Sequence, residues 1–404
     1  MTLEFEKLTA DLEIMAQTTA RRLSQRRERV TEALETLHTY RTNWTAVTNA
    51  LSTAKELSDP KFYRSARPFA ENEPLDSHIP APPPPPQATL IAADGSQIMP
   101  DRHAAHLYYL INVGGIIYHH GSGRTPETFS QPDIFYPESD EAIDDFNDTP
   151  GAVSIERDIQ EIETLAQQTV ANRHNAAPLL AILDQRLLYW PIGSAGVAEN
   201  TAVTEWGSHM TGIHQAGALL CGYIDRPGTS AVTTLLRSIV GLSDAHFNWR
   251  ELGQRKATQG VTDADVFSQI LGPGERSAVF ANISDPNNVF MAQDAANEVC
   301  FFYLNPGATG QGIARVDIPR WVAEDEASVT AVHSLLIDQC RIMGNYPYVI
   351  ARADEMAVVG RQDASELNFM IDVIMERHGI SNDITSKQGS KELARGGRTR
   401  HEGF

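Results

Sequence analysis

Two short apolar runs along the chain each end abruptly in a carboxylate. The first covers Leu90 to Ala93 and is followed by Asp94, Gly95 and Ser96. Four to eight apolar residues closed by a turn signal are typical of a buried strand. We expect Gly95 to let the chain turn sharply and Ser96 to hydrogen-bond the local backbone. The pattern places Asp94 at the rim of a sheet, although Asp-Gly is also a common turn that simply closes a strand.

The second run reads Pro-Leu-Leu-Ala-Ile-Leu-Asp and ends at Asp184. It follows a predicted amphipathic helix in which Arg157 and Glu161 lie one turn apart on the same side. If the two runs are neighbouring strands, Asp94 and Asp184 project close together. Two carboxylates within reach repel each other unless a divalent cation lies between them. The pair is therefore a candidate metal site.

The N-terminal part of the chain carries a different pattern. Residues 3–57 repeat apolar positions at intervals of three and four, which predicts helix. A basic cluster within it is interpreted as the solvated face of a helical hairpin, with an arm that contacts phosphate or a partner as the alternative; its members are Arg21, Arg22, Arg26, Arg27 and Arg29. Residues 58–87 are rich in proline, which lacks an amide donor and fixes φ, so we expect an extended polyproline spacer.

The rest of the chain alternates predicted strands and helices, which indicates a mixed α/β sheet flanked by helices. Residues 106–118 predict a hairpin that turns at Gly114 and Gly115, and residues 132–149 predict an exposed acidic loop. Nearby histidines lack the spacing of a helical metal site and are interpreted as ordinary rim residues; they are His103, His106, His119 and His120. Further strands are predicted at residues 277–280, 299–304 and 313–318, and further helices at 231–240, 263–271, 326–343 and 367–375.

Composition narrows the class of protein. A chain of 404 residues suggests two or three domains. Its three cysteines form no Cys-x-x-Cys pair, which argues against a zinc ribbon and suits a reducing cytoplasm. No secretory signal and no apolar run of membrane-spanning length occurs, so we expect a cytoplasmic protein without a membrane partner. The net charge of −19 argues against a protein that coats nucleic acid, yet it allows a local basic channel beside carboxylate-held metal ions.

The Asp-Gly-Ser strand end at Asp94, the second carboxylate at Asp184 and the Tyr-Pro segment at Tyr346 resemble, in this order, the NurA nucleases. The similarity runs over residues 88–380. It implies a ribonuclease-H-like core and a metal-dependent DNA nuclease of the 5′–3′ exonuclease and single-strand endonuclease type. It also implies manganese as cofactor, with magnesium as an alternative, and a ring-shaped homodimer. The implied partner is a HerA-type hexameric ATPase in DNA end resection.

Carried over by position, the resemblance makes Asp94 and Asp184 metal ligands. Glu161 corresponds best to the acidic ligand on the helix between them, with Glu156 and Glu163 as competitors. Phosphodiester hydrolysis with two divalent ions about 3.5–4 Å apart would let one carboxylate bridge the ions. We expect Asp94 to be that bridge, with the other two side chains completing the ligand shell.

Further residues match the family less closely. Tyr346 matches its tyrosine and would orient the phosphate or the attacking water. Asp354 stands where the family usually has a histidine; it could still ligate manganese or magnesium, which accept oxygen donors. Gln185 follows Asp184 where the family usually has a glycine. These departures motivate a second hypothesis, a non-catalytic ring or adaptor that docks on a motor ATPase. A phosphatase that acts on small substrates is the third hypothesis.

The pattern also predicts a division of the chain. We expect an N-terminal helical arm over residues 1–60, a proline-rich linker over 61–87, the nuclease domain over 88–380 and a basic tail over 381–404. Arginines inside the predicted nuclease domain either line a DNA path or form structural ion pairs; they are Arg226, Arg237, Arg276, Arg315 and Arg352.

Overall fold

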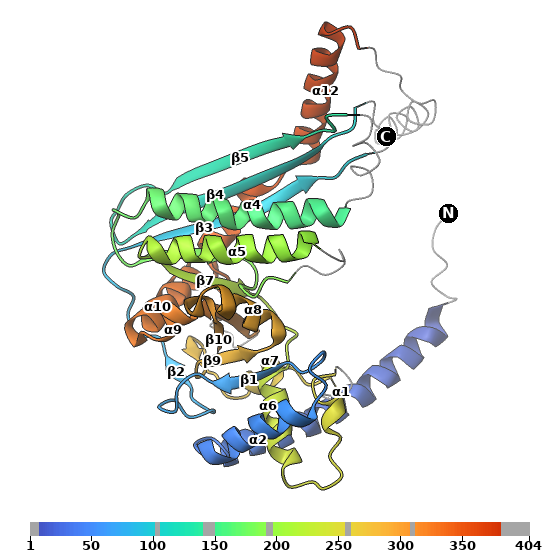
Figure 1. Ribbon diagram of the computed structural model, residues 1–404, viewed down its shortest axis with the longest axis vertical. Coiled ribbons are helices and arrows are strands. Elements are labelled where there is room, and N and C mark those ends of the chain that lie inside the picture. Colours follow the sequence, from blue (N-terminus) through green and yellow to red (C-terminus); the bar gives the residue numbers. More distant parts are fainter. Residues whose placement is uncertain are drawn as a thin grey trace, which may run out of the picture.

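The computed structural model describes residues 8–101, 106–139, 150–190, 197–254, 260–307 and 312–380. In this part of the chain, eleven strands join into one mixed sheet (Figure 1). They are β1 Ser65–Pro68, β2 Ile79–Pro80, β3 Ala88–Ile98, β4 Tyr109–His120, β5 Glu127–Phe135, β6 Leu179–Leu183, β7 Leu219–Ile224, β8 Glu275–Arg276, β9 Phe280–Ile283, β10 Val299–Leu304 and β11 Ala314–Pro319. Their order is β1-β9-β10-β11-β7-β6-β3-β4-β5, with β8 on β10 and β2 on β8.

Helices cover both faces of this sheet (Figure 1). They are α1 Thr9–Thr39, α2 Trp44–Leu57, α4 Pro150–Ala171, α5 Val197–Gln215, α6 Ala231–Gly241, α7 Asp263–Phe267, α8 Asp285–Gln293, α9 Arg320–Ala323, α10 Glu326–Met343, α11 Tyr348–Ala357 and α12 Arg361–Arg377. The apolar sides of α4 and α5 pack on one face of β3, β6 and β7. Those of α10 and α11 pack on the other face. None of the described helices is long and apolar enough to cross a membrane.

The strands from β3 to β7 confirm the expected ribonuclease-H-like sheet. Strands β3, β4 and β5 form an antiparallel meander, while β6 runs parallel to β3 and β7 runs parallel to β6. The parallel strands are apolar throughout because they are buried on both faces. In β3, alternate residues enter different cores, with Leu90 and Ala92 on the α11 side and Ile91 and Ala93 on the α4 side.

Two turns expected from glycine are wrong. Strand β3 does not turn at Gly95 but continues to Ile98, and Gly95 is paired with Val113 of β4. Likewise Gly114 lies inside β4, where it is paired with Asp94. A glycine inside a strand often marks a close approach by another chain segment rather than a turn, and this is the case here. A Cβ at Gly114 would collide with the backbone where Met356 joins the next residue in α11.

The proline-rich segment is not a spacer. Its residues 65–68 form β1, which pairs with β9, and β2 at residues 79–80 pairs with β8. Ala66 and Leu75 are fully buried in the core formed with α6 and β10. The segment is extended, as its prolines predict, but it closes one edge of the sheet. The domain boundaries stay a prediction.

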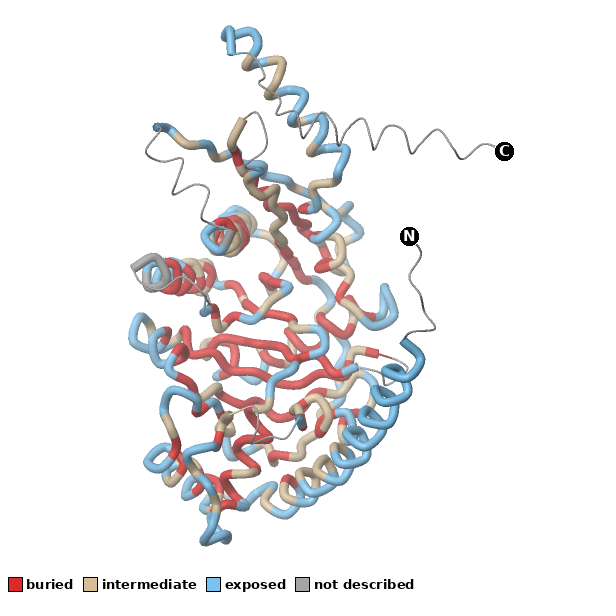
Figure 2. The backbone as a smooth tube through the Cα atoms, turned by 90° about the vertical axis from the view of Figure 1, so that its right-hand side faces the viewer, coloured by how far each residue is buried: buried red, intermediate tan, exposed pale blue. Residues whose placement is uncertain are grey.

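The N-terminal segment is helical, as expected, and its two helices, α1 and α2, both pack against α6. Leu37 of α1 and Val47 of α2 are buried against Leu235 and Ile239 of α6. The beginning of α1 and the whole of α12 are largely exposed, and Figure 2 shows both extending away from the buried sheet. The expected final helix is longer than predicted, and the predicted strand at 277–280 begins three residues later. His103 and residues 140–149 and 381–404 lie outside the described residues, and residues 132–135 belong to β5.

Candidate metal centre

The register of the sheet brings the two predicted aspartates together. The parallel pairing of β3 with β6 ends at Ala93 and Leu183, so Asp94 and Asp184 are the next residues on adjacent strands. Side chains alternate along a strand. Asp94 follows the β3 residues that face α11, and Asp184 follows the β6 residues that face the same helix. Both carboxylates therefore point to one side of the sheet, at the carboxyl edge where its parallel strands end.

The segment around α11 supplies two more site residues from that side. The C-terminal end of α11 is attached to the sheet, because Asn112 and Ser96 both donate hydrogen bonds to the Ala357 carbonyl, at 2.8 and 2.5 Å. This attachment places Asp354 beside Asp94, with which it shares a hydrogen bond. Tyr346 precedes the helix, and its hydroxyl hydrogen-bonds the Asp184 carboxylate.

The electrostatics of the site indicate excess negative charge. Burial raises the pKa of Asp94, and the nearby Asp354 carboxylate raises it further. Burial likewise raises the pKa of Asp184 to about 6, against the lowering effect of the hydrogen bond from Tyr346 and with added repulsion from Asp94 and Asp354. Clustered carboxyl groups with raised pKa values are typical of functional sites, including sites that bind a cation.

Glu161 approaches the same strand ends from the opposite face of the sheet. It lies on α4, is only 3% exposed, and lies close enough to Asp94 for the charge of that carboxylate to raise its pKa. Its approach depends on Gly95, where an added Cβ would lie 2.8 Å from Arg157 Cγ and 3.3 Å from Glu161 Oε2. Gln185 Nε2 donates a 3.0 Å hydrogen bond to Glu161 Oε1. Burial raises the pKa of Glu161 well above its ordinary value, and the charge of Asp94 adds to this.

The structure distinguishes among the three helix glutamates. Glu156 is exposed and accepts a hydrogen bond from Gln160, and Glu163 accepts one from Gln167 on the outer side of the helix. Neither is among the leading causes of the pKa shifts of Asp94 and Asp184. Of the three, Glu161 is the one that the fold brings to the strand ends.

One acidic residue of the site was missed by the sequence reasoning. Asp225 follows the last residue of β7, and its charge raises the pKa of both Asp184 and Tyr346. The signal was present in the sequence, because Leu219–Ile224 is a third apolar run that ends in a carboxylate. The side chain is half exposed and lies 3.7 Å from the Arg226 guanidinium.

The donor set fits a hard divalent cation in kind. Asp94, Asp184, Asp354 and Glu161 offer only carboxylate oxygens, which suit manganese and magnesium. In the described part of the chain, no three histidine, cysteine or acidic side chains stand close enough together to hold a metal ion as they are. The carboxylates are instead engaged in pairs, with one another or with Tyr346 and Gln185.

A family model described as the NurA domain matches residues 88–359, about two thirds of the chain. The chain belongs to the NurA family. A crystal structure of the NurA nuclease from Sulfolobus solfataricus is similar at 14% identity and a TM-score of 0.40, covering 82% of this chain and 94% of that one. A crystal structure of NurA with manganese is similar at 10% identity and a TM-score of 0.39, covering 75% and 92%. No curated protein matches.

Within this NurA domain, several candidate DNA-contacting arginines are structural. Arg276 and Arg315 are each 4% exposed and are bound to Glu73 and Asp317, so of the two alternatives they are structural ion pairs. Arg352 is paired with Glu355 on the surface of α11. Arg226 is 88% exposed beside the site. Of the histidines predicted to be ordinary rim residues, His106, His119 and His120 each lie close to a carboxylate, as in the 3.0 Å contact of His119 with Glu127.

Proposed function

We propose that this NurA-family chain is a divalent-metal-dependent DNA nuclease whose metal ligands are Asp94, Asp184, Asp354 and Glu161. The observation that carries the proposal is the register of β3 with β6, which sets the half-buried carboxylate of Asp94 next to the more exposed carboxylate of Asp184 at one edge of the sheet. Two like charges held this close repel each other unless a cation compensates them. Manganese is the proposed cofactor, with magnesium as the alternative.

The carboxylates have separable roles in this proposal. Asp94 lies between the other acidic groups, because Asp354 raises its pKa, and Asp94 in turn raises the pKa of Asp184 and that of Glu161. It is therefore the proposed bridging ligand. When bound, the metal ions would lower the pKa of a coordinated water and offset the charge that develops on the phosphate. A cation would also draw together carboxylates that repel one another without it.

Tyr346 acts as a neutral hydrogen-bond donor. Burial raises its pKa, and the negative charges of Asp184 and Asp225 raise it further, so the hydroxyl keeps its proton at neutral pH. From its position on Asp184, the hydroxyl can orient the carboxylate or donate to a phosphate oxygen. It does not serve as a general base.

Membership of the NurA family supports a proposal for the substrate and the partners. We propose that the chain cleaves DNA as a 5′–3′ exonuclease and single-strand endonuclease in end resection, as a homodimer together with a HerA-type hexameric ATPase. Exposed apolar side chains on the two protruding helices offer surface for assembly. Met15 of α1 is 59% exposed and Phe369 of α12 is 69% exposed.

The test compares cleavage of end-labelled single-stranded and duplex DNA by wild type, Asp94→Asn and Asp133→Asn, with manganese, magnesium or EDTA. Asp133 is an exposed aspartate of β5 and serves as the control with the same charge change. We expect wild type and the control to cleave only with metal, and Asp94→Asn to lose several orders of magnitude in rate, as removal of a metal ligand requires.

A melting-temperature series with manganese tests ligation separately. A site present only in the folded state must raise the melting temperature when it is filled. We expect the rise in wild type and not in Asp94→Asn. Equal cleavage by both proteins would refute the assignment. Absence of both cleavage and a manganese-induced rise in wild type would favour the non-catalytic adaptor.

A further inference from the structure

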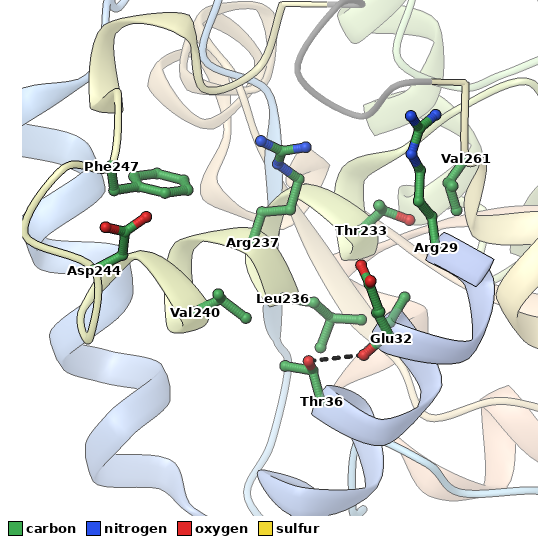
Figure 3. Close-up of a pocket in the computed structure, with 11 residues that line it drawn as sticks. Arg29, Glu32, Thr36, Thr233, Leu236, Arg237, Val240, Asp244, Phe247 and Val261 are labelled. Carbon is green, nitrogen blue, oxygen red and sulfur yellow. Dashed lines mark hydrogen bonds between the residues drawn. The ribbon is translucent and has the colours of Figure 1, made fainter. Parts of the chain in front are cut away.

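A second pocket lies between α1 and α6, apart from the carboxylate site, and its lining includes two arginines and two acidic residues, Glu32 and Asp244 (Figure 3). One face of each helix forms its walls at spacings of three and four residues. Its volume is about 320 Å³, within the range of small-ligand sites. The lining residues are Arg29, Glu32, Ala33, Thr36, Thr233, Leu236, Arg237, Val240, Asp244, Phe247 and Val261.

Two arginines meet in this pocket. Arg29 comes from α1 and Arg237 from α6, and Figure 3 shows both guanidinium groups directed to the same side. Burial lowers the pKa of Arg237, and the positive charge of Arg29 lowers it further, so the two cations lie within reach of each other. Nothing in the described part of the chain hydrogen-bonds the buried Nε of Arg237 or forms an ion pair with this side chain. A buried donor without an acceptor is costly to fold and is expected to have a ligand.

An aromatic ring is positioned beside these charges. Phe247 packs over Gly241, where an added Cβ would lie 2.7 Å from the ring. Gly241 is one helical turn beyond Arg237, so its lack of a side chain lets the ring reach the pocket wall. Leu236 and Val261 are buried there as well. The pocket thus joins a guanidinium pair to an apolar wall with one aromatic face.

We propose that this pocket binds a phosphate group carried by a nucleotide, either free or within a DNA strand. The planar guanidinium group matches phosphate oxygens with two parallel hydrogen bonds, and two adjacent cations favour a dianion or a phosphodiester. Phe247 and the apolar wall suit a nucleobase or sugar. The pocket gives an otherwise acidic chain a defined place for phosphate. The proposal does not depend on the nuclease activity.

The test measures binding by the full chain in EDTA, so that metal at the carboxylate site cannot contribute. The probes are inorganic phosphate, deoxyadenosine monophosphate and a fluorescent single-stranded oligonucleotide. We expect at least one probe to bind, and Arg237→Gln to weaken it about tenfold or more, as loss of a charged hydrogen bond implies. Arg237→Lys keeps the positive charge but cannot form two parallel hydrogen bonds, so its affinity for the probe should lie between those of wild type and Arg237→Gln. The probe bound most tightly identifies the source of the phosphate.

Arg22→Gln is the matched control, because Arg22 is an exposed arginine on the same helix as Arg29. It should bind like wild type. Arg237→Gln removes a repelled, unpartnered cation, so its melting temperature without ligand should equal or exceed that of wild type, which separates lost binding from lost folding. Equal binding by wild type and Arg237→Gln, an equal loss in Arg22→Gln, or no binding of any probe would overturn the proposal, whatever the outcome of the cleavage assay.

Discussion

Asp184 changes its charge in the pH range where enzymes are usually assayed. Its carboxyl has a pKa of about 6, raised by burial and by the neighbouring carboxylates. A metal ligand must be deprotonated, so protons and metal compete for this residue. Below pH 6 the apparent manganese affinity should therefore fall by about tenfold for each pH unit, and above pH 7 it should level off.

The measurement is manganese titration by calorimetry at pH 5, 6, 7 and 8. Asp184→Asn should bind metal more weakly and lose most of the pH dependence. A wild-type affinity that is the same at pH 5 and pH 7 would contradict the role of Asp184 as a ligand.

Gln185 holds Glu161 in place at the residue scale. Its 3.0 Å hydrogen bond is made to a buried carboxyl, and such bonds to charged groups are worth about 1.5–3 kcal/mol. We expect Gln185→Ala to lower the rate of metal-dependent cleavage by tenfold or more, with little change in KM, because it displaces a ligand rather than a substrate contact.

Gln167→Ala is the control for this prediction, since Gln167 donates a 3.1 Å hydrogen bond to Glu163, which is less buried than Glu161 and lies on the same helix. It should cleave like wild type. If both variants were fully active, Glu161 would not need positioning by Gln185.

The site residues differ in how far the sequence alone could predict them. The apolar runs sufficed to predict that Asp94 and Asp184 lie where buried strand segments end, because the first charged residue after an apolar run marks that point. Sequence could only rank Glu161 above its neighbours, since the helix pattern leaves its rotation against the sheet undetermined. Asp225 was missed although its strand carries the same signal. Its proximity to Asp184 depends on β7 pairing next to β6, which no local pattern specifies.

At the scale of elements, the glycines in β3 and β4 record how closely helices approach the sheet. Sequence assigned them to turns because glycine favours turns in general. In the fold they are paired strand residues, and the need for glycine comes from α4 over Gly95 and α11 over Gly114. The requirement for glycine arises from tertiary packing. It can therefore be recognised only when the helix that packs on each strand is known.

Gly114→Ala tests the contact of β4 with α11. The added methyl group would collide with the α11 backbone at Met356 and Ala357, which cannot move aside as a flexible side chain could. We expect a loss of about 1–3 kcal/mol in the free energy of unfolding, as for overpacked cores. Cleavage should fall by more than this loss of folded protein explains, because α11 carries Asp354.

Gly212→Ala provides the comparison. Gly212 lies in α5 with open space around its Cα and an ordinary helical backbone, so alanine there should be neutral or stabilise by up to about 1 kcal/mol. Urea unfolding of both variants gives the measurement. A Gly114→Ala protein as stable and active as wild type would show that α11 does not rest on this strand.

At the scale of the whole molecule, the mixed sheet and its flanking helices were predictable and the role of the N-terminal region was not. The alternation of apolar runs indicates an α/β fold whatever the strand order. The sheet, however, recruits β1 from the proline-rich segment to pair with β9, more than 200 residues later in the chain. Prolines correctly predict an extended backbone, but which strand edge receives it depends on the assembled core around Phe280 and Leu75.

A buried histidine makes the stability of the whole fold depend on pH. His333 is fully buried on α10, where Nε2 donates a 2.9 Å hydrogen bond to the Gly274 carbonyl. Burial lowers its pKa from 6.5 to about 4, and the charge of Arg276 contributes to the shift against the effect of that hydrogen bond. As pH falls below 6.5, His333 therefore becomes protonated in the unfolded chain, whereas in the folded chain it stays neutral until the pH approaches 4. The free energy of unfolding should fall across this window by up to about 3 kcal/mol.

The raised pKa values of Asp94, Asp184 and Glu161 act in the opposite direction, since the folded state holds those protons more tightly. The histidine contribution must therefore be measured as a difference. His333→Gln keeps an N–H donor for the Gly274 carbonyl but cannot titrate. In urea unfolding from pH 7.5 to 4.5 in EDTA, wild type should lose stability relative to His333→Gln as pH falls, with most of the change below pH 6.5. Parallel curves for the two proteins would mean that His333 accepts a proton in the folded state as readily as in the unfolded chain.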